Sequence, residues 1–271
     1  MVRTMEAAMA QFAITGGNGR IGRSIIPRLI GHGHQVRSID ITEAPDDATW
    51  EHVQASIADR DALAKAVKGA GTLIHLAGVA SERPWNEIVE ENIDGTRNAL
   101  QAAYVAGVPR VMLASSIHAV GRAPASSARE SRILPPRPDT YYGVSKVAME
   151  ALGSLYADQF GMAVVSARIC TFAEHPEASR SLATWLSPGD ATRLVEAVAT
   201  LTEPGHRIVW GVSANRPAWF PLEEGEAIGY FPQDDAVAIA ERSGAAIDLP
   251  DPEQPLGAPF GDERHPVGLR W

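Results

Sequence analysis

Two kinds of apolar pattern alternate along the first two thirds of the chain. Short and nearly continuous apolar runs are typical of parallel strands buried on both faces, and they occur at residues 12–14, 35–39, 52–55, 72–78, 110–116 and 162–169. Apolar residues three and four positions apart are typical of amphipathic helices, and this spacing occurs at residues 21–30, 59–67, 85–104 and 141–160. Strands that alternate with helices predict an α/β fold with a doubly wound parallel sheet, the Rossmann arrangement.

The regular alternation lapses after Arg168. The pattern then predicts a helix at residues 188–201, a strand at 207–212, and short helical or turn segments at 225–231 and 234–242. Residues 123–139 and the proline-rich tail from Leu249 carry no periodicity, so we expect a loop and an arm there. The chain is therefore expected to contain a nucleotide-binding Rossmann domain over residues 11–168. Residues 169–271 would form a small substrate-side appendage with a C-terminal arm.

A glycine-rich turn follows the first predicted strand. In Thr15-Gly16-Gly17-Asn18-Gly19-Arg20-Ile21-Gly22, the glycines fit two dinucleotide-binding spacings, with either Gly16 or Gly17 in first place. Glycines allow a tight turn and a close approach of the backbone to a pyrophosphate, and the first amides of the following helix face its charge. Since a strand precedes this turn and a helix follows it, the context that the motif requires is present.

Asp40 ends the strand predicted at residues 35–39 and lies eighteen residues after Gly22. In dinucleotide sites of this type, an acidic residue at about this distance bonds to the adenosine ribose and repels the 2′-phosphate of NADP. The sequence thus favours NAD as the cofactor. Arg20 and Arg37 are the residues that would support NADP instead.

The composition argues against several classes of function. With 24 basic and 33 acidic side chains and a net charge of −9, the chain has no electrostatic footprint for nucleic acid. No apolar run reaches membrane-spanning length, and residues 1–10 lack the apolar core of a secretory signal, so we expect a cytoplasmic protein without a membrane partner. The single cysteine and eight scattered histidines predict neither a disulfide nor a metal site.

Tyr142 and Lys146 lie four positions apart in the helix predicted at residues 141–160, so their side chains are neighbours on one helix face. An ammonium group beside a phenol stabilises the phenolate, and we therefore expect the pKa of Tyr142 to fall from about 10 toward the working pH. Such a phenol can take the proton of an alcohol while hydride leaves the carbon. The same pair is common on solvent-exposed helices, and it is the combination with the glycine turn and the strand ending Ser115-Ser116 that favours catalysis.

This combination resembles the extended branch of the short-chain dehydrogenase/reductase superfamily over residues 12–168. The resemblance is carried by the glycine turn, His75-Leu76-Ala77-Gly78, Asn92-Ile93-Asp94-Gly95-Thr96, Ala114-Ser115-Ser116 and Tyr142-Gly143-Val144-Ser145-Lys146. It implies that Ser116, Tyr142 and Lys146 are catalytic, with Ser116 orienting the substrate oxygen. It also implies an NAD site made of Gly16, Gly19, Arg20, Ile21, Gly22, Asp40, Ser56, Ile57, Leu76, Ala77, Gly78, Asn92, Tyr142 and Lys146.

The second half of the chain is similar to uronate dehydrogenases and related aldose and sugar-phosphate 1-dehydrogenases, which oxidise the anomeric carbon of a cyclic sugar to a lactone with NAD. The similar segments are 115–121, 137–139, 168–169, 180–187 and 209–215. The resemblance implies a substrate site made of Ala80, Ser81, Ser116, Ile117, His118, Tyr142, Thr171 and Arg180. Within it, Arg180 would bind the substrate carboxylate.

This chain departs from the family pattern at three of these positions. Ile117 replaces an asparagine, Ala80 replaces a serine with Ser81 beside it, and Thr171 replaces a second serine. The loss of the asparagine at Ile117 and of the serine at Ala80 removes hydrogen-bonding groups, so the resemblance leaves the identity of the sugar open.

Two other interpretations remain from the sequence. The first is a sugar epimerase or dehydratase on the same fold, although Ile117 and His118 do not supply the acidic pair that dehydratases use after the active hydroxyl residue. The second is a non-catalytic NAD-binding sensor, although such proteins typically lose the tyrosine or the lysine. We expect an NAD-dependent dehydrogenase of a sugar or sugar acid that forms a homo-oligomer.

Overall fold

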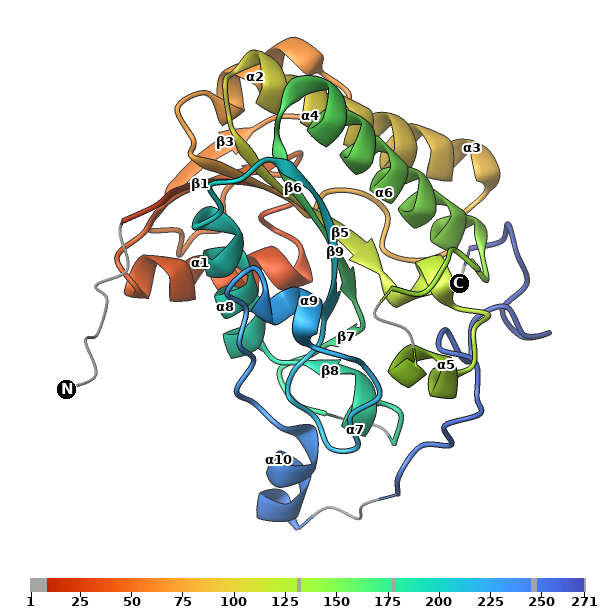
Figure 1. Cartoon of the computed structure of the whole chain (residues 1–271). Coiled ribbons are helices and arrows are strands. Elements are labelled where there is room, and N and C mark those ends of the chain that lie inside the picture. Colours follow the sequence, from red (N-terminus) through yellow and green to blue (C-terminus); the bar gives the residue numbers. More distant parts are fainter. Residues whose placement is uncertain (1–8, 131–132, 177–178, 245–247, 271) are drawn as a thin grey trace.

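The computed structural model describes residues 9–130, 133–176, 179–244 and 248–270. Among them, seven strands form one parallel sheet in the order β3-β2-β1-β4-β5-β6-β9 (Figure 1). The strands are β1 (Gln11–Thr15), β2 (Gln35–Asp40), β3 (Glu51–Gln54), β4 (Thr72–His75), β5 (Arg110–Ser116), β6 (Ala163–Ile169) and β9 (Gly205–Gly211). The strand order reverses between β1 and β4, and ligands of such sheets bind in the crevice at the carboxyl ends of these strands. The expected doubly wound parallel sheet is confirmed.

Helices cover both faces of the sheet (Figure 1). On one face, α1 (Arg20–Gly31) and α8 (Pro188–Ala199) pack through side chains such as Leu29 and Leu194. On the other face lie α2 (Arg60–Val67), α4 (Gly95–Val105) and α6 (Tyr141–Phe160), with Leu63, Leu100 and Met149 in the core. Because both faces are covered, the strands are apolar almost without interruption. No helix in the described ranges is long and apolar enough to cross a membrane.

The helix predicted at residues 85–104 is not regular throughout. It consists of α3 (Trp85–Ile88), a π-helical stretch η1 (Val89–Asp94) and α4. Asn92 lies in the π-helical stretch, where its side chain accepts a hydrogen bond from the Val79 amide at 2.8 Å and donates one to the Val79 carbonyl at 3.1 Å. Apolar spacing did not reveal this stretch, because a π-turn shifts the register locally without removing the helix.

Residues 169–271 contribute β9 to the main sheet and, together with residues that follow β5, build a further apolar cluster. This part contains a two-stranded parallel sheet of β7 (Thr171–Phe172) and β8 (Trp185–Leu186). It also contains three short helices, α7 (Ser181–Thr184), α9 (Glu223–Glu226) and α10 (Ala236–Ser243). The cluster packs Ile117, Trp210, Trp219, Phe220 and Leu256 against one another.

One local prediction is wrong. The segment at residues 123–139 is not entirely a loop, because α5 (Ala125–Glu130) forms within it and buries Ala125 and Ala128. The short helical or turn segment predicted at residues 225–231 is confirmed, since α9 ends within it at Glu226 and a turn follows to Gly229. Beyond this turn, Tyr230 donates a hydrogen bond from its hydroxyl to the Val212 carbonyl at 2.7 Å.

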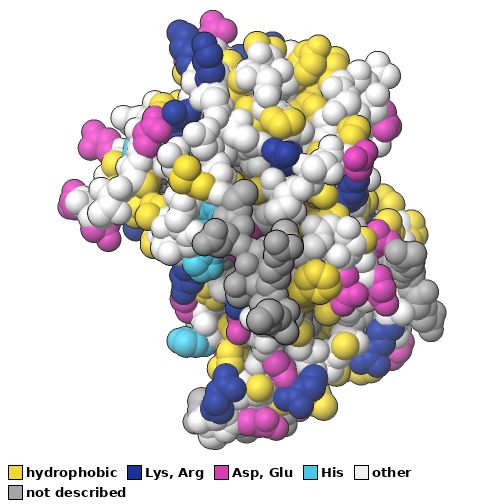
Figure 2. Space-filling view, turned by 60° about the vertical axis from the view of Figure 1, so that its left-hand side comes forward, with side chains coloured by type: hydrophobic (Ala, Val, Ile, Leu, Met, Phe, Trp, Pro, Cys, Tyr) yellow, Lys and Arg dark blue, Asp and Glu magenta, His cyan; other side chains and the backbone are white. Residues whose placement is uncertain are grey.

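Charged side chains of both signs are interspersed over the part of the surface that Figure 2 colours. Neither sign forms a continuous patch there, as expected for a chain with 24 basic and 33 acidic side chains. The coloured part of this face does not present the basic stripe that nucleic-acid-binding proteins use.

Candidate active site

The glycine turn between β1 and α1 lies at the carboxyl end of β1. Gly16 has a φ of +70°, and a Cβ atom there would lie 2.7 Å from the Ala77 amide nitrogen. A Cβ on Gly22 would overlap the carbonyl oxygen of Gly17. Gly19 is the N-cap of α1 and provides no side-chain cap, so the amides of the first turn keep their hydrogen-bonding capacity. This geometry suits a pyrophosphate, which would approach the free amides directly.

A cavity of about 460 Å³ lies beside this turn at the ends of β2 and β4. Six residues of the predicted NAD site line it: Gly16, Asp40, Ser56, Ile57, Ala77 and Gly78. Asp40 is oriented by the Asn18 amide, which donates to one carboxylate oxygen at 3.0 Å, and by Thr42, which donates to the other. The carboxylate therefore has a fixed place in the cavity where the adenosine ribose is expected.

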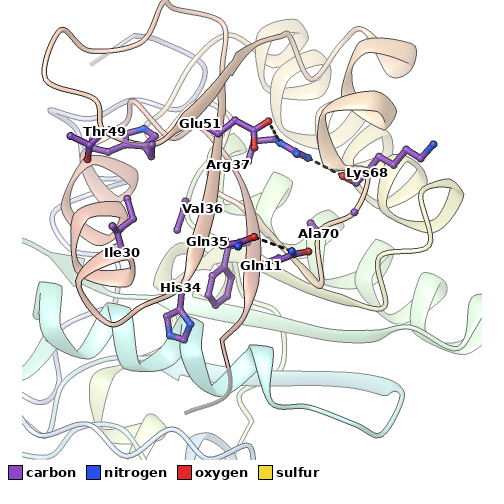
Figure 3. A pocket seen from close by; sticks show the side chains of 13 residues that line it. Gln11, Ile30, His34, Gln35, Val36, Arg37, Thr49, Glu51, Lys68 and Ala70 are labelled. Atoms are coloured by element: carbon purple, nitrogen blue, oxygen red, sulfur yellow. Dashed lines mark hydrogen bonds and ion pairs between the residues drawn. The ribbon is translucent and has the colours of Figure 1, made fainter. Parts of the chain in front are cut away.

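The two arginines that would have supported NADP lie elsewhere. Arg37 donates to Glu51 at 2.7 Å and to the carbonyl oxygens of Ala66 and Lys68, each at 2.9 Å. Figure 3 shows the contacts of Arg37 with Glu51 and Lys68, which lie in a separate cavity near the amino ends of β1 and β2. Arg20 lines the cavity of Ser116 and Tyr142 and not the one that contains Asp40. Neither guanidinium is placed to bind a 2′-phosphate beside Asp40.

We therefore predict a preference for NAD over NADP that depends on Asp40. Replacement of Asp40 by serine removes a charged hydrogen-bond acceptor and its repulsion of phosphate. The ratio of kcat/KM for NAD to that for NADP should fall about ten- to a hundredfold, the range for one hydrogen bond to a charged group. Arg37→Ala is the matched control and should leave the ratio unchanged. Equal rates of the unmodified enzyme with the two cofactors would contradict the prediction.

A second cavity of about 400 Å³ lies at the carboxyl ends of β4, β5 and β6. Predicted cofactor, catalytic and substrate residues meet in its wall: Arg20, Ile21, Leu76, Gly78, Ala80, Ser116, His118, Tyr142, Lys146, Thr171 and Arg180. Ser116 comes from the end of β5, Tyr142 and Lys146 from the first turns of α6, and Arg180 from the segment before α7. The topology thus brings together residues that are far apart in the sequence.

The start of α6 is held by two side chains. Thr140 is the N-cap and accepts the Gly143 amide at 3.0 Å. The buried carboxylate of Glu82, in the loop after β4, accepts the amides of Tyr141 at 3.1 Å and Tyr142 at 2.8 Å. A negative charge is stabilising at a helix N-terminus because it meets free amides and the positive end of the helix dipole. Glu82 thereby fixes the turn that carries Tyr142.

Tyr142, Ser116 and Lys146 form a compact buried group. The Lys146 ammonium lies 5.2 Å from the centroid of the Tyr142 ring and donates to the Ala114 carbonyl at 2.8 Å. Burial raises the pKa of Tyr142 to about 12, although a hydrogen bond from Ser116 and the charge of Arg20 both lower it. Burial also lowers the pKa of Lys146 to about 8. The expected fall in the pKa of Tyr142 is therefore wrong for this structure, since burial outweighs the neighbouring charges.

Arg180 lines the same cavity. Its Nη1 atom donates to the Thr171 hydroxyl at 3.0 Å, and its Nη2 atom donates to the Leu256 carbonyl at 2.6 Å. Nε is shielded from solvent and has no hydrogen-bond partner among the described residues. A buried donor without a partner destabilises the structure. The guanidinium can therefore donate a further hydrogen bond, from Nε, to an acceptor that the described residues do not provide.

Residues 12–188 match the model of the NAD dependent epimerase/dehydratase family. The chain belongs to this family. A uronate dehydrogenase of Pseudomonas syringae pv. tomato is 34% identical over 96% of this chain and 98% of its own length. An NAD-dependent glucose-6-phosphate dehydrogenase of Haloferax volcanii is 33% identical over 82% of this chain and 93% of its own.

Among solved structures, a mutant uronate dehydrogenase from Agrobacterium tumefaciens complexed with NAD matches with a TM-score of 0.85. It is 32% identical, and the match covers 97% of this chain and 100% of that one. These relatives confirm the resemblance expected from the sequence and the prediction of an NAD-dependent enzyme.

Five of the predicted site residues do not line either of the two cavities. Ile117 is 1% exposed and packs in the apolar cluster with Trp219 and Leu256, so its side chain faces away from the cavity of Ser116 and Tyr142. Ser81 accepts a hydrogen bond from Arg83 at 2.8 Å. Gly19 and Gly22 shape the turn, as described above. Asn92 also lies outside both linings, and its amide supports the backbone beside Gly78.

The sequence did not single out several residues that the structure brings to the site. Phe260 of the C-terminal arm lines the cavity of Ser116 and Tyr142 and stacks on His118 with ring centroids 4.5 Å apart. Cys170 also lines it. Asp139 lies behind His118, with its carboxylate 2.8 Å from the His118 Nδ1 atom. Only Asp139 had a signal, as part of the segment similar to the uronate dehydrogenases. No group of three or more potential metal ligands is found in the described part of the chain.

Proposed function

We propose that this enzyme oxidises the anomeric C1 hydroxyl of a cyclic sugar acid to its lactone, with NAD as the cofactor. The observation that carries the proposal is that Ser116, Tyr142, Lys146 and Arg180 line one cavity, which shares Gly78 with the cavity beside the glycine turn. The similarity to uronate and sugar-phosphate dehydrogenases supports the substrate class.

The residues present fit NAD. Gly16 leaves a cradle that a Cβ atom would fill, the first turn of α1 has free amides, and Asp40 stands at the ribose end. Lys146 and Tyr142 would contact the nicotinamide end, and Leu76 and Gly78 would lie along it. When bound, oxidised NAD supplies the acceptor for the hydride that leaves C1.

The chain's own residues would carry the proton chemistry. The C1–H bond of the sugar breaks as hydride leaves, and Tyr142 takes the proton of the C1 hydroxyl, so that a C=O bond of the lactone forms. Ser116 donates toward the phenol oxygen and orients the substrate oxygen. The positive charge of Arg20 favours the phenolate, because it lowers the pKa of Tyr142. Arg180 would pair with the sugar carboxylate through its guanidinium, which presents donors in a planar fork.

We further propose that the two parts of the chain have different roles. Residues 11–168 would bind NAD, and residues 169–271 would supply Thr171, Arg180 and the arm that closes the substrate cavity. We also propose a cytoplasmic location and a homo-oligomeric state. Exposed apolar side chains on α4 and α6, Tyr104, Val105, Leu155 and Phe160, support the latter.

The proposal is tested by NADH absorbance with a panel of uronates, neutral aldoses and aldose phosphates. Turnover of a uronate, with a lactone as the first product, supports it. An epimerase would interconvert sugars without net NADH formation, and a sensor protein would bind NAD and turn over nothing. Either outcome would reject the dehydrogenase.

Arg180→Ala tests the charge that the substrate carries. Loss of a charge-assisted contact, about 1.5–3 kcal/mol, predicts a rise in KM of about ten- to a hundredfold for the acidic sugar. The rise should be small for the neutral aldose of the same ring configuration. Arg122→Ala is the control, since Arg122 binds the Gly261 carbonyl outside the cavity. An equal rise in KM for the acidic and the neutral sugar would mean that Arg180 does not bind the charged group of the substrate.

A further inference from the structure

His118 is held by contacts with four residues. Its Nδ1 atom lies 2.8 Å from a carboxylate oxygen of Asp139, and its backbone amide donates to the Ser116 hydroxyl at 3.2 Å. Phe260 stacks on one face of the ring, with an interplanar angle of 13°, and Tyr142 meets it edge to face at 5.7 Å. These contacts fix the plane of the imidazole and prevent it from turning over.

The carboxylate of Asp139, which contacts His118, is completely buried. The Asp139 side chain is 0% exposed, and its second oxygen accepts the Thr140 hydroxyl at 3.0 Å. Gly121 and Gly257, which are far apart in the sequence, both lie against the Asp139 carboxylate. A Cβ atom on either glycine would overlap it. The Gly257 amide donates to the Gly121 carbonyl at 2.9 Å, so the C-terminal arm closes this enclosure.

The geometry points to one tautomer of His118. A carboxylate only accepts hydrogen bonds, so the ring proton must stand on Nδ1. The second ring nitrogen, Nε2, has no hydrogen-bond partner among the described residues, and His118 lines the catalytic cavity. An imidazole with its proton on Nδ1 presents Nε2 as an acceptor.

We propose that Asp139 is a positioning residue that holds His118 with Nε2 as an acceptor, so that the site selects a sugar with a hydroxyl donor at the matching ring position. This deepens the proposed function and rests on it for the substrate. Asp139 does not itself line the cavity, so its hydrogen bond reaches the substrate only through His118. An ether or an absent hydroxyl at that position would leave Nε2 unpaired, which a buried site penalises.

The charge of Asp139 also reaches the other groups that face the substrate. Burial is the main cause of the raised pKa of Tyr142, and Asp139 adds to the rise. Burial likewise lowers the pKa of Arg180, and Asp139 opposes that change. The buried carboxylate of Asp139 thus interacts electrostatically with Tyr142 and Arg180 as well as contacting His118.

The first test does not depend on the sugar. Histidine labelled with ¹⁵N in the NAD-bound protein reports the ring tautomer through its nitrogen shifts, and the His118 signals are assigned by their loss in His118→Phe. A proton on Nδ1 of His118 is expected. A proton on Nε2 would overturn the proposal, whatever the substrate is.

The second test is a double-mutant cycle on the best substrate of the panel. Asp139→Ala should lower kcat/KM by about ten- to a hundredfold, the range for one hydrogen bond to a charged group. Asp139→Asn should recover part of this loss, because the amide oxygen can still accept the Nδ1 proton. The double variant Asp139→Ala/His118→Phe should be no worse than His118→Phe alone. Multiplicative losses would show that Asp139 does not act through His118.

Monodeoxy forms of that substrate complete the experiment. For the unmodified enzyme, kcat/KM for one of these deoxy sugars should be more than about tenfold lower than for the parent sugar. In Asp139→Ala this difference should disappear, and the ratios of kcat/KM for the other deoxy sugars to that for the parent sugar should stay unchanged. Thermal unfolding of each variant separates a folding defect from this loss. If no sugar is oxidised but the tautomer is as expected, the proposed function fails and the positioning of His118 stands.

Discussion

Tyr142→Phe is expected to lower kcat by about 10²- to 10⁴-fold, the contribution of a positioned general base. Only the hydroxyl is removed, so the ring still packs against His118 and below Lys146. The affinity for NAD, measured by calorimetry, should therefore change little, whereas Lys146→Ala should reduce both turnover and NAD affinity. Steady-state NADH formation measures the loss.

The matched control is the preceding residue. Tyr141 lies outside the cavity and packs against Trp85 with ring centroids 5.1 Å apart, so Tyr141→Phe should retain normal turnover. Because the pKa of Tyr142 is about 12, its base form is scarce at neutral pH, and kcat/KM should rise with pH between about 6 and 8. A Tyr142→Phe enzyme that keeps this rise, or a substantial part of its activity, would show that another group is the base.

Glu150→Ala is expected to destabilise the fold more than any surface substitution. Glu150 of α6 binds Arg168 of β6 through two hydrogen bonds of 2.8 Å, and both side chains are almost completely buried. It also accepts the Ser115 hydroxyl at 2.6 Å, directly beneath the strand end that carries Ser116. Removal of the carboxylate leaves a buried and unpaired guanidinium, which costs about 3–5 kcal/mol of unfolding free energy.

Urea unfolding followed by circular dichroism measures this loss. Asp94→Ala is the control, because the pair of Asp94 and Arg97 is about half exposed and such pairs contribute about 1 kcal/mol or less. A double replacement of Glu150 and Arg168 by methionine should recover much of the stability, since it removes the unpaired charge. If Glu150→Ala is as stable as the unmodified protein, the guanidinium must find another partner or water.

The local signals of this sequence were enough for the main fold. Apolar runs identified the strands of the central sheet because a parallel strand is buried on both faces, wherever it lies in the sheet. The glycine turn was recognisable because its backbone conformation admits no side chain at Gly16. Tyr142 and Lys146 could be paired from their spacing alone, since a helix brings residues four apart together.

The tertiary structure decided the features that depend on distant neighbours. Phe260 and Asp139 reach His118 from segments without periodicity, so no local pattern could place them at the cavity. Ile117 was expected to face the substrate but packs in the apolar cluster, because the direction of its side chain depends on how the chain turns after β5. The pKa of Tyr142 moved opposite to the expectation from Lys146. Spacing shows which charges are adjacent, but only the packed structure shows how far a group is removed from water.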